Sequence, residues 1–88
     1  MTAVADNGNL VTDITAEKLR EAPTDHRVMI RCDEHFTNGL FGPEHTEPEM
    51  TFLALVRPGG NLELVIVGDS ARLMLGISVG EPVAVEWA

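Results

Sequence analysis

The clearest pattern of hydrophobic and polar positions lies in residues 59–88, the last third of the chain. Leu62, Leu64 and Ile66 are spaced two apart, which is the period of a strand with one well-buried face. A Pro-Gly-Gly-Asn turn precedes this strand, and the continuous apolar run 50–57 precedes the turn. Two apolar runs on either side of such a turn predict an antiparallel hairpin.

The segment after the hairpin predicts a short helix and a final strand. Asp69 or Ser70 can cap the start of the helix with a side-chain oxygen. Gly76 can take the left-handed conformation that ends a helix. A second alternation, over residues 83–87, is typical of a strand and places Trp87 on its buried side.

The first half of the chain carries weaker patterns. Residues 1–12 are small and polar without a period, so we expect a flexible arm. Apolar positions within residues 13–22, followed by Pro23, predict a short helix that ends there. Residues 27–32 alternate and predict a strand. Residues 33–49 hold Asn-Gly, Gly-Pro and Glu-Pro breakers, and they predict a long irregular loop, which in a small domain is usually functional or mobile.

Together these elements predict one small α+β domain over residues 13–88, with about four strands and two short helices, including the antiparallel hairpin. Such strands can also curl into a partly open barrel. The 88 residues fit a single domain, and the apolar share of 44% is ordinary for a folded chain.

The charge balance is strongly acidic, with 14 Asp and Glu against 6 Lys and Arg and a net charge of −8. A specific DNA- or RNA-binding protein usually neutralises about six to ten phosphates with lysine and arginine. Six basic residues spread along the chain disfavour that function, and they disfavour an anionic membrane for the same reason. We therefore expect no direct nucleic-acid binding, no membrane contact, and a protein partner with a basic surface.

The chain has one cysteine, Cys32, so no internal disulfide can form. No apolar run is long enough to span a bilayer, and the first residues lack the charged and apolar regions of a signal peptide. These features predict a reducing compartment, with the cytoplasm as the first choice.

Three side chains are candidates for a metal site: Cys32, His35 and His45. A Cys-x-x-His pair can lie on one turn, and a nearby glutamate can complete four ligands. A structural zinc site usually has two such pairs, whereas this chain has one. We therefore expect no bound metal and no cofactor.

Cys32 and His35 also have the residue types of a thiolate nucleophile and its base. Asp33 and Glu34 lie between them and oppose the formation of a thiolate. No third orienting group or oxyanion-hole motif is recognisable. The sequence therefore predicts a protein that is not an enzyme.

Apolar side chains interrupt the acidic loop 33–49, and they either fold back onto the sheet or form a binding patch. The glutamates of the loop are either a solvated segment or a contact surface that steers a partner. On the binding hypothesis, the partner-binding residues are Phe36, Leu40, Phe41, Glu44, Glu47 and Glu49.

The segment from Gly60 to Val85 resembles the AbrB/MazE-type swapped-hairpin domains. The match is carried by Gly60-Asn61, Leu75-Gly76-Ile77, Gly80-Glu81, Val83 and Val85. The resemblance implies a cradle-loop, barrel-like fold and an intertwined homodimer that binds operator DNA. The arm that contacts DNA is basic in that family, whereas the stretch before Gly60 offers only Arg57.

These observations predict a small, acidic, non-enzymatic protein-interaction module. An inhibitor or adaptor that mimics nucleic acid on a basic groove, encoded by a phage or a mobile element, fits the size and charge. Two alternatives are an antitoxin or transcriptional regulator domain of the AbrB/MazE type, and a structural subunit such as a capsid-decorating protein.

Overall fold

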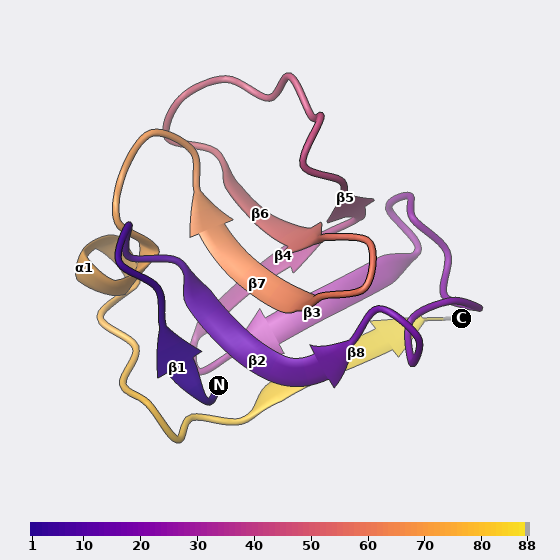
Figure 1. The fold of residues 1–88 in the computed structure, drawn as a ribbon, viewed down its shortest axis with the longest axis horizontal. Coiled ribbons are helices and arrows are strands. Elements are labelled where there is room, and N and C mark those ends of the chain that lie inside the picture. Colours follow the sequence, from indigo (N-terminus) through magenta and orange to yellow (C-terminus); the bar gives the residue numbers. More distant parts are fainter. Residues whose placement is uncertain (88) are drawn as a thin grey trace.

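The computed structural model describes residues 1–87, which form two packed β-sheets and one short helix (Figure 1). The five-stranded sheet has the order β1-β2-β7-β6-β5, and the three-stranded sheet has the order β4-β3-β8. Among the strands that the structure describes, only β5 and β6 pair in parallel. Neither sheet closes into a barrel within the described residues. The elements are β1 (Ala3–Val4), β2 (Leu10–Thr15), β3 (Val28–Cys32), β4 (His35–Asn38), β5 (Leu40–Phe41), β6 (Phe52–Val56), β7 (Asn61–Ile66), α1 (Ala71–Leu75) and β8 (Val83–Trp87).

The main core lies between the two sheets. Leu10, Leu62 and Leu64 face it from β2 and β7 and are fully buried. Val28 and Ile30 face it from β3 and are also fully buried. Each aliphatic side chain removed from water in this way contributes roughly 1.5–3 kcal/mol. The period-two alternation of these strands therefore provides the main driving force that holds the sheets together.

The hairpin and the helix expected in the second half of the chain are confirmed. β6 and β7 pair antiparallel, and the turn closes with a hydrogen bond from Gly60 N to Arg57 O at 2.9 Å. Ser70 is the N-cap of α1, since its hydroxyl accepts from Leu73 N at 3.3 Å. Gly76 ends the helix in the left-handed region with φ of 66°.

The expectation of a helix over residues 13–22 was wrong. β2 continues to Thr15. The residues after it form successive turns, in which the N–H of residue i+3 donates to the carbonyl of residue i, as from Leu19 N to Ala16 O. The β-branched side chains of β2 favour a strand. In addition, the Thr12 hydroxyl donates to Leu62 O of β7 at 2.8 Å, which ties this segment to the sheet.

Three further details differ from the expectations. Residues 1–12, expected as an arm, contribute β1 and the first part of β2. Residues 33–49 contain β4 and β5 and are irregular only after Phe41. Trp87 is 45% exposed rather than buried. Residues 1–87 therefore form eight strands and one helix instead of about four strands and two helices. No helix in the described part of the chain has the length and apolar character needed to cross a membrane.

Candidate functional site

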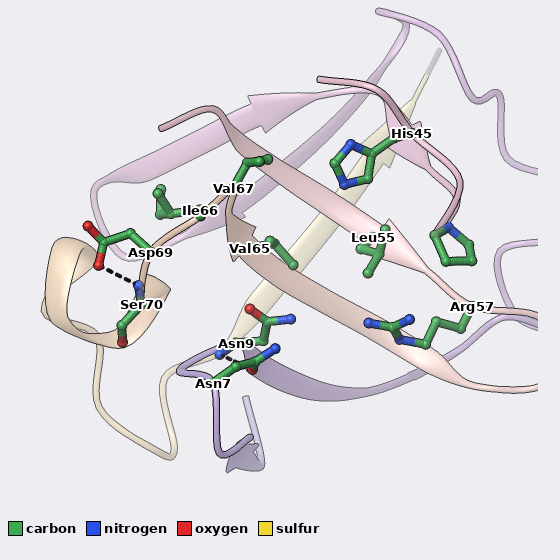
Figure 2. Close-up of a pocket in the computed structure, with 12 residues that line it drawn as sticks. Asn7, Asn9, His45, Leu55, Arg57, Val65, Ile66, Val67, Asp69 and Ser70 are labelled. Atoms are coloured by element: carbon green, nitrogen blue, oxygen red, sulfur yellow. Dashed lines mark hydrogen bonds between the residues drawn. The ribbon is translucent and has the colours of Figure 1, made fainter. Parts of the chain in front are cut away.

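An open pocket of about 460 Å³ lies on the outer face of the five-stranded sheet (Figure 2). Its floor is formed by Leu55 of β6, Val65 of β7 and Val67 just after β7. The size falls in the range of roughly 300–1,000 Å³ that is usual for small-molecule sites. It therefore has the dimensions to hold a small ligand.

The floor is apolar because apolar side chains cluster on both faces of this sheet. Leu53, Leu55 and Val65 point away from the main core and form a second buried cluster. Phe41 and Val67 pack against this cluster from its sides. Leu55 is 4% exposed and Val65 is 8% exposed, so little of the side chains at the floor of the pocket is in contact with water.

One wall of the pocket joins the start of β2 to the start of α1. Gly8 has a φ of +90° and lies tightly against Ser70, so that a Cβ at position 8 would be 2.8 Å from Ser70 Cα. Arg72 N donates to Gly8 O at 3.0 Å, and Asp69 Oδ1 accepts from Ser70 N at 2.7 Å. These contacts fix two segments that are far apart in the sequence as one polar wall.

Asn9 is the most buried polar residue of that wall, with 5% exposure. Its Nδ2 donates to Glu63 Oε1 at 3.1 Å, and its backbone N donates to Asn7 Oδ1 at 3.1 Å. Its amide oxygen makes no hydrogen bond within residues 1–87. In that part of the chain no fully buried side-chain N or O atom lacks a partner, so this oxygen is not fully buried. It provides a hydrogen-bond acceptor beside the apolar floor.

The opposite wall consists of Pro43 and His45 from the loop after β5. His45 Nδ1 accepts from Glu47 N at 3.1 Å, and its ring meets Phe41 edge to face at a centroid distance of 6.4 Å. A neutral imidazole that accepts at Nδ1 carries its proton on Nε2. The His45 ring therefore offers a donor from a fixed position.

The residues expected to bind a partner do not gather on one surface. Phe36 is 58% exposed and lies on the outer face of the three-stranded sheet, opposite Arg31 of β3. Leu40 and Phe41 are partly buried against the two clusters, which is the folded-back alternative. Phe36 alone keeps the exposure that an aromatic anchor needs. The remaining three, Glu44, Glu47 and Glu49, lie in the loop between β5 and β6.

The three candidate metal ligands are not brought together. Cys32 and His35 are register partners on β3 and β4, whereas His45 lies in a different part of the fold. Cys32 is 1% exposed in the main core, and His35 Nε2 lies 3.0 Å from Leu75 O. His45 lies over the other sheet, in the wall of the pocket. No group of three or more His, Cys, Asp or Glu is placed to hold a metal ion between residues 1 and 87.

Burial raises the pKa of the Cys32 thiol, and the nearby carboxylates of Glu81 and Asp33 add to this shift. A raised pKa lowers the fraction of thiolate, the reactive form. His35 is engaged with a backbone carbonyl at the end of α1. The net raised pKa therefore opposes a thiolate at Cys32, with the N-terminal ammonium acting in the opposite direction.

The sequence pattern does not indicate Asn7 and Asn9 as site residues, because residues 1–12 predict an arm. One signal could have found them. Gly8 stands between the two asparagines, directly before the alternation of Leu10 and Thr12. An Asn-Gly-Asn turn that leads into an alternating run is typical of the entry to a strand.

No protein-family model and no curated protein matches this chain. Among solved structures, the chain is similar to an uncharacterized conserved protein from Thermotoga maritima, with a TM-score of 0.73 and 17% identity. The match covers 96% of this chain and 34% of that protein. It shows a shared fold, and this chain spans about a third of the length of that protein. The resemblance to AbrB/MazE-type domains stays a prediction.

Proposed function

We propose that this domain binds a small molecule in the pocket on the outer face of the five-stranded sheet. The observation that carries the proposal is Asn9, a buried polar side chain whose amide oxygen lies beside an apolar floor. An apolar pocket with a few convergent polar groups is the usual form of a ligand site. The Asn9 oxygen has no protein partner within residues 1–87, so it is available to a donor group of a ligand.

The lining defines the chemistry of the ligand. Leu55, Val65 and Val67 favour a ligand with an apolar face. The Asn9 oxygen favours an N–H or O–H donor at the edge of that face. The lining holds one carboxylate, Asp69, and one guanidinium, Arg57, whose charge is paired with Glu63. This balance, together with the net charge of −8, favours a cation over an anion. We therefore expect a small molecule with an apolar body and donor groups along one edge.

Benzamidine is a suitable probe, because it combines a flat apolar ring with a fork of N–H donors. We expect it to bind with a Kd of about 1 mM, in the range open to so small a ligand. A titration followed by ¹H–¹⁵N NMR should shift the amide signals of residues 7–9 and 65–70. Benzoate, which has the same shape but carries acceptors, should cause smaller shifts at the same concentration.

Val67→Trp should abolish this binding, because the larger side chain fills the floor of the pocket. Val79→Trp is the matched control, since Val79 is 60% exposed and does not line the pocket. Equal binding by the two folded variants, or shifts spread evenly over the chain, would show that the pocket is not the ligand site.

Contact with another protein is a second candidate function, which retains the interaction module expected from the sequence. The observation in its favour is a short stretch with three exposed apolar side chains. Leu73 is 80% exposed, Met74 is 50% exposed and Val79 is 60% exposed. Exposed apolar groups close together often belong to a protein interface. The net charge of −8 favours a partner with a basic surface.

This second function is tested with the double variant Leu73→Ser and Met74→Ser. We expect it to lose a protein that the wild type retains from an extract of its host. Phe36→Ser is the control, because Phe36 is also exposed but lies on the outer face of the other sheet. If both variants retain the same proteins as the wild type, the stretch 73–79 is not an interface.

A further inference from the structure

A line of hydrogen bonds crosses the outer face of the five-stranded sheet under one end of the pocket. Asn9 Nδ2 donates to Glu63 Oε1 at 3.1 Å, and Arg57 Nε donates to Glu63 Oε2 at 3.2 Å. Glu63 lies on β7 between its register partners on β2 and β6, and its side chain is 15% exposed. Both oxygens of this carboxylate are therefore engaged at fixed positions.

The line of hydrogen bonds determines which end of the Asn9 amide faces Glu63. A side-chain amide has an NH₂ donor at one end and a carbonyl acceptor at the other. Two acceptors repel each other, so a carboxylate that also accepts from Arg57 must meet the NH₂ end. The carbonyl oxygen of Asn9 then turns away from Glu63. Because Asn9 is only 5% exposed, little water reaches the side of its amide that faces Glu63, and the opposite orientation would lose this bond without full compensation.

We propose that Glu63 is a positioning residue that gives the pocket its preference for ligands with hydrogen-bond donors. This inference rests on the proposed small-molecule function of the pocket, and it names the ligand class of that same site. Glu63 does not line the pocket and acts only through the orientation of Asn9.

Arg57 makes the effect of a substitution predictable. A guanidinium only donates, so in Glu63→Gln the amide oxygen of the substituted side chain must face Arg57. Its NH₂ group then faces Asn9, whose amide must rotate to accept from it. The NH₂ group of Asn9 is now on the pocket side, and the wall offers a donor instead of an acceptor at this position. Because a donor replaces the acceptor at this position, the preference should change from ligands with donors to ligands with acceptors.

Aniline and acetophenone are suitable probes, because both are uncharged near neutral pH and differ in offering a donor or only an acceptor. We expect the wild type to bind aniline about tenfold more tightly than acetophenone, the ratio that one mismatched buried hydrogen bond gives. Glu63→Gln should reverse the order. Glu86→Gln, which removes the same charge from an exposed position on β8, should keep the wild-type order.

A second measurement needs no ligand. In the wild type, nuclear Overhauser effects should connect the side-chain NH₂ protons of Asn9 with the γ protons of Glu63, and these should weaken in Glu63→Gln. Their absence in the wild type would overturn the positioning role. An unchanged preference for aniline in folded Glu63→Gln would also overturn it, while leaving the pocket a ligand site. If neither probe binds the wild type, the ligand function proposed for the pocket fails. The nuclear Overhauser effects between Asn9 and Glu63 then still test whether Glu63 orients the Asn9 amide.

Discussion

Replacing Gly8 by alanine is expected to lower the free energy of unfolding by about 3 kcal/mol, the sum of backbone strain and overpacking. Gly8 has a φ of +90°, which L residues rarely adopt. In addition, the new Cβ would lie 2.8 Å from Ser70 Cα and still closer to the Ser70 side chain. Backbone atoms cannot yield as the end of a flexible side chain does, so the start of α1 must move.

Gly59→Ala is the matched control, because Gly59 has a φ of +73° and no atom lies within 4 Å of the added Cβ. It should cost about 1 kcal/mol from backbone strain alone. Unfolding in urea measures both values. Equal losses in the two variants would show that residue 8 and Ser70 are not tightly packed. The same experiment bears on the pocket, since Gly8 joins the two segments of its polar wall.

Replacing Leu64 by alanine is expected to lower the free energy of unfolding by about 3 kcal/mol through the cavity it leaves. Leu64 is fully buried between the sheets and belongs to the same cluster as Leu10 and Ile30. Leu73→Ala removes the same atoms from a side chain that is 80% exposed, and its effect should stay within about 0.5 kcal/mol. Similar effects from the two variants, measured by urea unfolding, would contradict the position of the core between the two sheets.

The parts of the fold that the sequence predicted are those that depend on close neighbours. The hairpin of β6 and β7 needs only two apolar runs and the turn between them. The helix α1 needs only Ser70 at its start and Gly76 at its end. Each signal lies within a few residues of the element that it specifies, so composition and period were sufficient.

The parts that the sequence did not predict depend on distant partners. β2 is held by β7, and the bond from Thr12 to Leu62 joins residues 50 positions apart. A polar residue, Thr12, fills a fully buried position of β2, so the sequence shows no clear hydrophobic period there. β4 and β5 have four and two residues, which are too few to show a reliable period.

The candidate site was hidden from the sequence for the same reason. Asn9 is a common turn residue when read locally. Its role depends on Glu63, which is 54 positions away and fixes the orientation of the amide. Phe41 gave the opposite error. An aromatic side chain in an acidic loop resembles a binding anchor, but in the structure Phe41 packs against the second apolar cluster.

The order of strands in the two sheets also has a consequence for how this chain reaches its native state. β2 pairs with β7, and β3 pairs with β8, so each sheet joins an early segment to a late one. Closing such long loops costs entropy before the contacts repay it, whereas the β6–β7 hairpin closes a loop of only a few residues. We therefore expect the hairpin to form first and to act as the template on which β2 docks. β3 can pair early with β4, but its pairing with β8 must await the synthesis of that strand, so the three-stranded sheet is the last of the described parts to be completed during translation.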